Sequence, residues 1–482
     1  MLRVCMTEDI RLNERETMEE GVDVYTLIDR ASYALHSRLP DGKVLVVVGK
    51  GKNGADGLSL AIRLQGARLV KVYSLYDDLC EEGARYMEKY VGSGGEIVQD
   101  IDEALMWADV VVDSIFGIGL SREVSSDVAR VISKINASGR YVLSADIPSG
   151  LNADNGKVMG ACVEADLTVS FSPVKAGYLL NDGKDYVGEV VYADVGIDSE
   201  HYTASLYSEE DSIVPARRQN THKGDYGRVY VIAGSPCYVG ASLLATASTS
   251  ACLRSGAGLV TLCVPYSMRE VYQSRVLEET LAFLPDDNGK IIFDQRVFDD
   301  IKSKADCIVI GMGLGANEYL VDIVRYLVST YSGKLVLDAD ALNCLEGEIG
   351  VFDRKAGDIV LTPHPKEFGR ISGVETRDIN PIYHARTYAR ENGVTVLLKG
   401  ATTVVAYPDE RVYLVANGGP HLAKGGSGDV LAGMVAGSIV QGYSVERAVY
   451  LHALAGRRAL ADFREAGVVA SELIRYINRQ DF

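Results

Sequence analysis

The feature that most constrains the fold of this chain is a repeated alternation of short apolar runs and polar, glycine-containing loops. In the first half, apolar runs lie at 43–48, 109–113 and 141–146, and each leads into a polar loop. The second half repeats the pattern at 228–233, 307–310, 334–337, 359–361 and 394–398. Because segments of helical character separate the runs, they are typical of buried parallel strands joined by crossover helices. The sequence therefore predicts an α/β protein with two doubly wound domains.

Length and charge narrow the domain organisation and the class of partner. With 482 residues, the chain is too long for one hydrophobic core. The stretch 199–217 is polar and loses periodicity, so we expect a linker there, between domains at 1–205 and 217–482. A net charge of −17 argues against nucleic-acid and anionic-membrane partners, since neither would meet a broad basic surface. We expect a homo-oligomer that acts on small molecules.

Cysteine usage and hydropathy predict the compartment. No CxxC pair occurs, so we interpret the cysteines as reduced and buried, as in a cytoplasmic protein. They are Cys5, Cys80, Cys162, Cys237, Cys252, Cys263, Cys307 and Cys344. Residues 1–15 are charged and contain no signal-peptide core, and no apolar run reaches the roughly 18 residues that a membrane span requires.

Carboxylates follow three predicted strands of the first half. The first strand leads into a glycine-rich loop at 49–57, which carries Asp56, before a helix predicted at 58–64. The other two strands end at Asp113 and Asp146. Ligands of doubly wound sheets bind beyond the carboxyl ends of the strands, so these residues are expected on one rim. Each alone is typical of a helix cap, but three together, each beside glycines, favour a binding site. Their spacing is not that of the usual NAD fingerprint.

Three motifs in this half, GKGKNGADG, DSIFGIGLSRE and DIPSGLNADNG, resemble the YjeF N-terminal domain, the NAD(P)H-hydrate epimerase family, over about residues 10–196. The resemblance implies a Rossmann-like domain that interconverts the R and S epimers of hydrated NADH or NADPH, with Asp146 placed for proton transfer. The implied substrate-binding residues are Lys52, Asn53, Gly54, Ala55, Asp56, Gly117, Ile118, Gly119, Leu120, Ser121, Arg122, Glu123 and Asp146.

The same resemblance implies a potassium site at Asn53, Asp113 and Ser149, whose oxygen donors suit a hard cation. Two positions depart from the usual family pattern, because Lys52 stands for an Asn and Ala55 for a Gly. A lysine is tolerable beside a pyrophosphate, whereas a methyl group at residue 55 is expected to hinder close approach of the substrate.

A glycine-rich segment near the C-terminus, GGSGDVLAG at 425–433, opens a predicted helix of small residues at 430–439. Backbone N–H groups at such a helix N-terminus form an anion site together with the helix dipole, and glycines let the backbone approach a phosphate. Asp429 is either a helix cap or a base that deprotonates a hydroxyl for phosphoryl transfer. The upstream segment KGATT, which begins at Lys399, favours the base.

Six segments in order, HKGDYG, GAGLVT, GMGLG, TPHPKEF, KGATT and GGSGDVLAG, resemble the NAD(P)H-hydrate dehydratase branch of the ribokinase-like superfamily, over about residues 217–478. The resemblance implies a reaction with ADP or ATP and Mg²⁺, in which Asp429 accepts the proton of the hydrate's hydroxyl. The implied nucleotide-binding residues are Lys399, Gly400, Ala401, Thr402, Thr403 and Gly428. The implied hydrate-binding residues are Ala241, Gly313, His364 and Asp429. Lys366 replaces the usual Gly, which is expected to alter the nucleotide preference.

Together the halves predict a bifunctional repair enzyme, because the product of one domain is the substrate of the other. One alternative is a vitamin kinase that phosphorylates a hydroxymethylpyrimidine or thiazole alcohol, with an appended binding domain. Another makes the first domain an interaction or RNA-binding module without an active site. The retained Asp56, Asp113 and Asp146 and the acidic balance count against that module.

Overall fold

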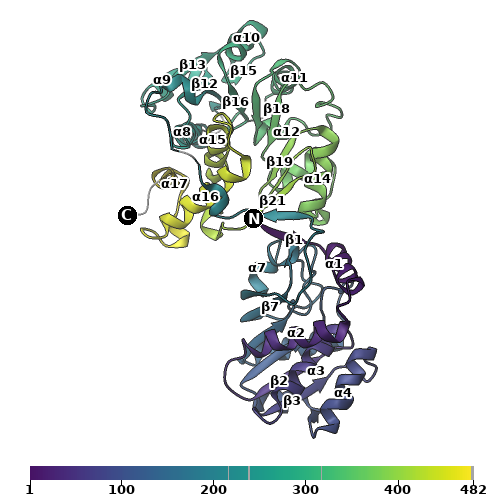
Figure 1. The fold of residues 1–482 in the computed structure, drawn as a ribbon. Helices are drawn as coiled ribbons and strands as arrows, with labels where there is room; N and C mark the ends of the chain where they lie inside the picture. Colours follow the sequence, from purple (N-terminus) through teal and green to yellow (C-terminus); the bar gives the residue numbers. More distant parts are fainter. Residues whose placement is uncertain (215, 237–238, 316, 479–482) are drawn as a thin grey trace. The chain divides into compact units, whose positions relative to one another are not determined.

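The computed structural model describes residues 1–482 except 215, 237–238, 316 and 479–482. The chain divides into two compact units, Leu2–Ala204 and Ser205–Phe482, and Met1 groups with the second (Figure 1). Both units are built on largely parallel sheets with crossover helices, so the predicted α/β class is confirmed. Within the described part of the chain, no helix combines the length and the apolar character needed to cross a membrane.

The N-terminal unit contains a seven-stranded sheet with the order β4-β3-β2-β5-β6-β7-β9, in which all neighbouring strands are parallel. Its strands are β2 (Val44–Val48), β3 (Val70–Ser74), β4 (Glu96–Val98), β5 (Val110–Ser114), β6 (Tyr141–Ala145), β7 (Leu167–Phe171) and β9 (Glu189–Ala193). A separate parallel pair joins β1 (Leu2–Cys5) to β8 (Val174–Lys175). The strand order reverses at the β2–β5 pair, and this topology places a crevice beyond the carboxyl ends of these strands.

Helices cover both faces of this sheet. They are α1 (Thr7–Glu19), α2 (Val24–His36), α3 (Lys52–Leu64), α4 (Glu81–Gly92), α5 (Ile101–Trp107), α6 (Ser126–Ala137) and α7 (Gly183–Tyr186). One hydrophobic core packs α2, α3 and α4 against the sheet, and a second packs α5 and α6. The two helices expected in the first forty residues and the apolar strand runs are confirmed.

Helix α3 begins at Lys52, so the prediction that this helix starts at residue 58 was wrong. Glycine lowers helix propensity, which is why the sequence favoured a loop. The structure assigns the glycines to close packing instead. A Cβ added to Gly54 would lie 2.1 Å from the carbonyl oxygen of Gly49. The first turn of α3 therefore lies directly against the end of β2.

The C-terminal unit contains the strand series β13-β12-β11-β16-β17-β18-β19-β20-β21. Pairing is parallel from β13 to β19 and antiparallel at β20 and β21. The strands are β11 (Arg228–Ile232), β12 (Leu259–Pro265), β13 (Thr280–Leu284), β16 (Cys307–Ile310), β17 (Lys334–Leu337), β18 (Asp358–Leu361), β19 (Thr395–Leu398), β20 (Thr403–Ala406) and β21 (Val412–Val415). Ser205 and Leu206 of β10 (Ala204–Leu206) pair in parallel with β21, and β14 (Asp286–Asp287) and β15 (Lys290–Ile291) form a small hairpin.

Helix α15 is the central buried helix of this unit. Its contact with α8 needs small residues, because a Cβ added to Gly433 would lie 2.0 Å from the carbonyl oxygen of Ser248. The helices of the unit are α8 (Val239–Arg254), α9 (Arg269–Gln273), α10 (Gln295–Lys304), α11 (Leu320–Thr330), α12 (Asp340–Asn343), α13 (Pro365–Ser372), α14 (Pro381–Asn392), α15 (Ser427–Ile439), α16 (Val445–Ala459) and α17 (Ala470–Tyr476). This packing fixes the N-terminus of α15 near the carboxyl ends of the strands.

The cysteines whose placement is described are free thiols, as predicted. Burial of all of them was also predicted, and this was wrong for Cys80 and Cys344, which are half-buried. Burial nevertheless raises the pKa of the Cys344 thiol to about 12, so this thiol remains protonated. Cys237 lies outside the described residues.

Candidate active sites

A cavity of about 580 Å³ lies beyond the carboxyl ends of β2, β5 and β6 in the N-terminal unit, and residues of α1 and α2 also line it. The expected substrate residues that line it are Lys52, Asn53, Asp56, Gly117, Ile118, Gly119, Leu120, Ser121, Arg122 and Asp146. Gly54, Ala55 and Glu123 are not among its lining residues. The methyl group of Ala55 is fully buried in the hydrophobic core, so it points away from any ligand in the cavity.

Asp146 is held at this cavity by a buried lysine. The Asp146 Oδ1 atom lies 2.8 Å from Lys175 Nζ and accepts a hydrogen bond of 3.0 Å from Phe171 N. The Lys175 side chain is 1% exposed, and its ammonium also donates to Ser170 Oγ at 3.2 Å. Asp146 has a φ of +67°, which is uncommon for a residue other than glycine, and the Tyr178 hydroxyl donates to its carbonyl oxygen. Backbone and side-chain contacts therefore both fix the carboxylate.

Two further carboxyl groups of the cavity have raised proton affinity. Burial raises the pKa of Asp56 well above its ordinary value. The negative charges of Asp146 and Glu14 raise it further, and the positive charge of Lys52 lowers it. Burial also raises the pKa of Glu14, where Asp146 adds to the effect and Lys52 opposes it. Glu14 lines the cavity from α1. The cavity thus combines protonatable carboxyl groups with a lysine-bound carboxylate.

The three residues expected to hold potassium are joined through the backbone of Phe116. Asn53 Nδ2 donates to the Phe116 carbonyl at 2.9 Å, and Ser149 Oγ accepts from Phe116 N at 2.8 Å. Ser149 Oγ donates to Asp113 Oδ1 at 2.5 Å, and Ser144 Oγ donates to Asp113 Oδ2 at 2.9 Å. The Asn53 Oδ1 atom is buried and has no hydrogen-bond partner among the described residues. An amide oxygen without a donor fits a hard cation.

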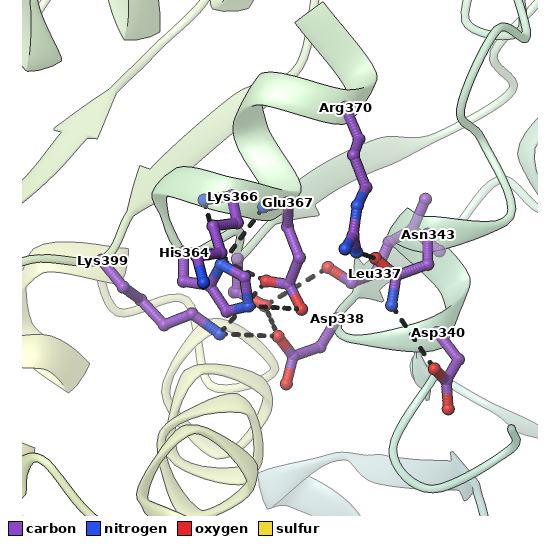
Figure 2. Close-up of polar contacts among 10 residues, drawn as sticks. Leu337, Asp338, Asp340, Asn343, His364, Lys366, Glu367, Arg370 and Lys399 are labelled. Atoms are coloured by element: carbon purple, nitrogen blue, oxygen red, sulfur yellow. Dashed lines mark hydrogen bonds and ion pairs between the residues drawn. The ribbon is translucent and has the colours of Figure 1, made fainter. Parts of the chain in front are cut away.

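The second site lies at the carboxyl ends of β17, β18 and β19 (Figure 2). Lys399 Nζ forms an ion pair of 3.0 Å with Asp338 Oδ1 and lies 3.9 Å from Glu367 Oε2. Thr362 Oγ1 donates to the same Asp338 oxygen at 2.7 Å. Burial acts to lower the pKa of Lys399, but the carboxylates of Asp338 and Glu367 outweigh it and raise this pKa. The lysine is therefore a charged, nearly fixed cation.

A reciprocal cap at the start of α13 orients His364 (Figure 2). The His364 Nδ1 atom accepts hydrogen bonds of 3.1 Å from Lys366 N and Glu367 N, and Glu367 Oε2 accepts one of 2.8 Å from His364 N. Pro365 occupies the first turn, where its fixed φ suits a helix start. Because Nδ1 is an acceptor, the neutral ring carries its proton on Nε2, and the side chain is 47% exposed. His364 Nε2 lies 3.4 Å from Glu367 Oε1, so Glu367 contacts both the backbone and the ring of His364.

Helix α15 begins at a left-handed Gly426, with a φ of +88°, and a Cβ added to Gly428 would lie 3.4 Å from Lys399 Nζ. The glycine turn therefore lies against the lysine. Asp429, in the first turn, has its pKa raised to about 7, because burial and the charge of Asp338 outweigh the attraction of Lys399. The helix N-cap is Gly426 and no side chain caps it, so Asp429 lacks the contact of a capping residue. A carboxylate of this pKa is suited to accept a proton near neutral pH.

The strand-end loop that carries Asp338 is strained. Ala339 has a φ of +48°, a conformation that costs energy for a residue with a Cβ. Asp340 Oδ2 accepts a hydrogen bond of 2.7 Å from Gly315 N, so this loop contacts the predicted glycine turn that contains Gly313. The strained residue directly follows Asp338, whose buried carboxylate binds Lys399, and strained backbone is often found at functional sites.

The remaining expected residues lie in the β19–β20 turn and in α8. Thr402 and Thr403 are buried, and Thr402 Oγ1 has no hydrogen-bond partner among the described residues, whereas Gly400 and Ala401 are exposed. Ala241 is in the first turns of α8, but its side chain is outside the part of the chain that is described.

Two family models and several curated relatives match the chain. The model described as NAD(P)H-hydrate dehydratase matches residues 229–479, and the model described as YjeF-related protein N-terminus matches residues 22–177. A bifunctional NAD(P)H-hydrate repair enzyme of Moorella thermoacetica is 35% identical over 95% of this chain and 90% of its own length. The chain belongs to the bifunctional NAD(P)H-hydrate repair enzyme family. A member from Escherichia coli is 31% identical over 99% of this chain and 93% of its own length.

Solved structures give a partial match. An ADP/ATP-dependent NAD(P)H-hydrate dehydratase from Bacillus subtilis is 28% identical and covers 57% of this chain and 96% of its own, with a TM-score of 0.48.

The structure of this repair enzyme adds residues that the motifs did not single out. In the N-terminal unit these are Glu14, which lines the cavity, and Lys175, which binds Asp146. Lys175 follows an apolar strand run, and a buried lysine cannot be told from an exposed one by sequence pattern. Glu14 lies one helical turn from the buried Ile10. This spacing places both residues on the same face of α1, and it was the one feature of the sequence that could have indicated that Glu14 points inward. In the C-terminal unit, Glu367 was visible only as a part of the TPHPKEF segment.

Proposed function

We propose that the N-terminal unit interconverts the R and S epimers of hydrated NADH or NADPH at the Asp146 cavity, and that the C-terminal unit dehydrates the S epimer with ADP or ATP at Asp429. One observation carries the dehydratase assignment. Asp429 faces a lysine that is already paired with Asp338, and its pKa of about 7 makes it a base near neutral pH. Membership of the repair enzyme family supports the same reading.

The proposed dehydration passes through a phosphorylated hydrate, because phosphate is a good leaving group at neutral pH and hydroxide is a poor one. Asp429 accepts the proton of the hydrate's hydroxyl as its oxygen attacks the terminal phosphoryl group of the nucleotide. Phosphate then leaves, the ring loses a proton, and the double bond returns. Lys399 and the N–H groups at the start of α15 attract the nucleotide's phosphates.

The donors of this site fit a magnesium ion. Mg²⁺ usually binds proteins through one or two carboxylates, together with water and nucleotide phosphates. The carboxylates of Asp338 and Glu367 both face Lys399 and are 2% and 7% exposed. These two residues would hold the ion, which supplies positive charge to the phosphates when bound.

The N-terminal cavity supports a dinucleotide with anionic groups. Among its lining residues are Arg11, Lys50, Lys52 and Arg122, although the whole chain has a net charge of −17. Glu14, Asp56 and Asp146 also line the cavity, so the basic side chains outnumber the acidic ones by one, and they suit a pyrophosphate. Asn53, whose buried amide oxygen has no donor in the part of the chain that the structure describes, would hold potassium together with Asp113 and Ser149.

Product analysis separates the repair reaction from the vitamin-kinase alternative. The chain is incubated with hydrated NADH, ADP and Mg²⁺, and inorganic phosphate and the absorbance of reduced nicotinamide are followed together. We expect equal amounts of phosphate and restored cofactor. A second incubation replaces the hydrate with hydroxymethylpyrimidine or a thiazole alcohol. A stable phosphorylated alcohol there, without phosphate release or restored cofactor in the first incubation, would support the kinase instead.

We also propose a cytoplasmic location, which the free thiols of the described cysteines support. The homo-oligomer expected from the sequence stays a prediction, and light scattering on the purified chain tests it.

A further inference from the structure

Epimerisation of a hydrate inverts one carbon and requires two proton transfers, one to the departing oxygen and one from the incoming oxygen. Water adds to an enamine double bond so that the hydroxyl is on the carbon next to the ring nitrogen. That carbon inverts if the hydroxyl departs as water, the ring becomes planar there, and water returns from the other face. Departure needs an acid, and return needs a base. This inference rests on the proposed epimerase function of the N-terminal unit.

We propose that Glu14 of α1 is a catalytic residue of the epimerase: it donates the proton to the departing hydroxyl, while Asp146 accepts the proton of the incoming water. In the first step the proton moves from Glu14 to the hydroxyl oxygen, the C–O bond breaks, and the lone pair of the ring nitrogen forms a C=N⁺ bond. In the second step a water oxygen bonds to the carbon from the other face, and Asp146 takes its proton. One proton has moved between the carboxyl groups, and the reverse reaction or solvent returns it.

The position of Glu14 supports this role. Glu14 and Asp146 both line the 580 Å³ cavity, from α1 and from the end of β6. The Glu14 carboxyl group has no hydrogen bond or ion pair with another described residue, so it is available to a ligand. Its neighbours on α1 differ, because Asp9 caps the helix and Glu16 pairs with His201 at 2.9 Å.

The charges around the two carboxyl groups assign them opposite tasks. Asp146 has its own buried cation, because Lys175 Nζ lies 2.8 Å from Asp146 Oδ1. The charge of Asp146 raises the pKa of Glu14, whereas those of Lys52, Lys175 and Arg11 lower it. Glu14 in turn raises the pKa of Asp56. Burial is the largest influence and raises the pKa of Glu14, so this group keeps its proton to higher pH than an exposed glutamate. Two carboxyl groups in contrasting environments are typical of an acid–base pair.

The pair has a predictable pH dependence. The productive state carries one proton on the two groups together, so the rate falls when both lose their protons and when both are protonated. The alkaline limb reports loss of the Glu14 proton. Because burial raises the pKa of Glu14, this limb should begin above the pH at which an exposed glutamate ionises.

The test uses the full chain without nucleotide, so that only epimerisation is observed. Pure R hydrate is supplied, and its conversion to the S epimer is followed by chiral chromatography over a range of pH. In Glu14→Gln we expect kcat to fall about 100-fold or more, KM to change little, and the alkaline limb to disappear. Glu14→Asp should keep the limb and part of the rate. The control is Glu19→Gln, an exposed residue at the end of the same helix, which should match the wild type.

Solvent labelled with ¹⁸O adds an independent readout. The proposed step breaks the C–O bond, so every inversion should place one solvent oxygen in the product. Inversion without label, a Glu14→Gln rate within twofold of wild type, a retained alkaline limb, or an equal loss in Glu19→Gln would each overturn the role of Glu14. A wild-type chain that does not interconvert the epimers would instead overturn the proposed function.

Discussion

The two sites of this chain use the same elements, an aspartate and a lysine at the carboxyl ends of parallel strands, in opposite arrangements. In the N-terminal unit, Lys175 binds Asp146, the carboxylate proposed to react. In the C-terminal unit, Lys399 binds Asp338, and among the described residues no lysine forms an ion pair with the proposed base Asp429. Burial and the charge of Asp338 then raise the pKa of Asp429 to about 7. On two related folds, the lysine therefore binds the proposed reacting carboxylate in one site and a neighbouring carboxylate in the other.

The largest effect is expected for Asp429→Asn, which removes the base but keeps the size of the side chain. Dehydratase turnover should fall about 1,000-fold, because general base catalysis typically contributes 10²–10⁴-fold. Nucleotide binding should remain, since Lys399 and the glycine turn are unchanged. Turnover is measured by the absorbance of reduced nicotinamide and binding by calorimetry. The exposed Asp409→Asn, in the β20–β21 hairpin, is the matched control. Wild-type turnover in Asp429→Asn would remove this residue from the mechanism.

The next effect is expected for Lys175→Met, which leaves the Asp146 carboxylate without its cation. Epimerisation should fall about 100-fold, and the N-terminal unit should lose about 3–5 kcal/mol of unfolding free energy, as when one partner of a buried pair is removed. Lys134→Met breaks an exposed pair with Asp102 and should cost about 1 kcal/mol or less. The free energy of unfolding, from thermal unfolding, and the epimerisation rate are measured for both variants and compared. Equal effects at the two lysines would show that burial of the pair is unimportant.

The pH dependence of dehydration sharpens the contrast between the sites. Asp429 must be ionised to accept a proton, so kcat/KM should be low in acid and rise through its pKa of about 7. The rise should approach tenfold per pH unit below that value. Breaking the Lys399–Asp338 pair with Asp338→Asn should lower the midpoint, because Asp338 raises the pKa of Asp429 and competes for the lysine. The midpoint is obtained from the dehydratase kcat/KM between pH 5 and pH 9. A midpoint that is unchanged in Asp338→Asn would contradict the claim that Asp338 raises the pKa of Asp429.

The smallest effect is expected for Ala55→Gly, which restores the usual family residue. The Ala55 methyl is fully buried in the core, so its removal should cost about 0.5–1 kcal/mol of unfolding free energy in a helix. The KM for the hydrate should not improve, because the methyl does not line the cavity. A KM several-fold lower would revive the sequence-based expectation that this residue hinders the substrate.

Sequence reasoning identified the elements whose signals are local. The apolar runs predicted β2, β5 and β6, and the glycine turn predicted the start of α15 within three residues. Sequence reasoning failed where the packing between distant segments determines the local structure. The glycines of α3 were interpreted as a loop, but Gly54 lies in the helix, and it is a glycine where the end of β2 leaves no room for a Cβ. Lys175 and Glu14 reach the cavity from segments distant in sequence, and no spacing rule connects them to Asp146.

The most direct test of the account supplies equal amounts of the R and S epimers of hydrated NADPH, with ADP and Mg²⁺, to the full wild-type chain and to Asp146→Asn. The wild type is predicted to restore reduced cofactor from nearly all of the hydrate. Asp146→Asn is predicted to stop at the S half over the same period, because its dehydratase unit is intact. A wild type that stops at half would contradict the claim that one chain performs both steps. Complete conversion by Asp146→Asn at the wild-type rate would contradict the role proposed for Asp146 in epimerisation.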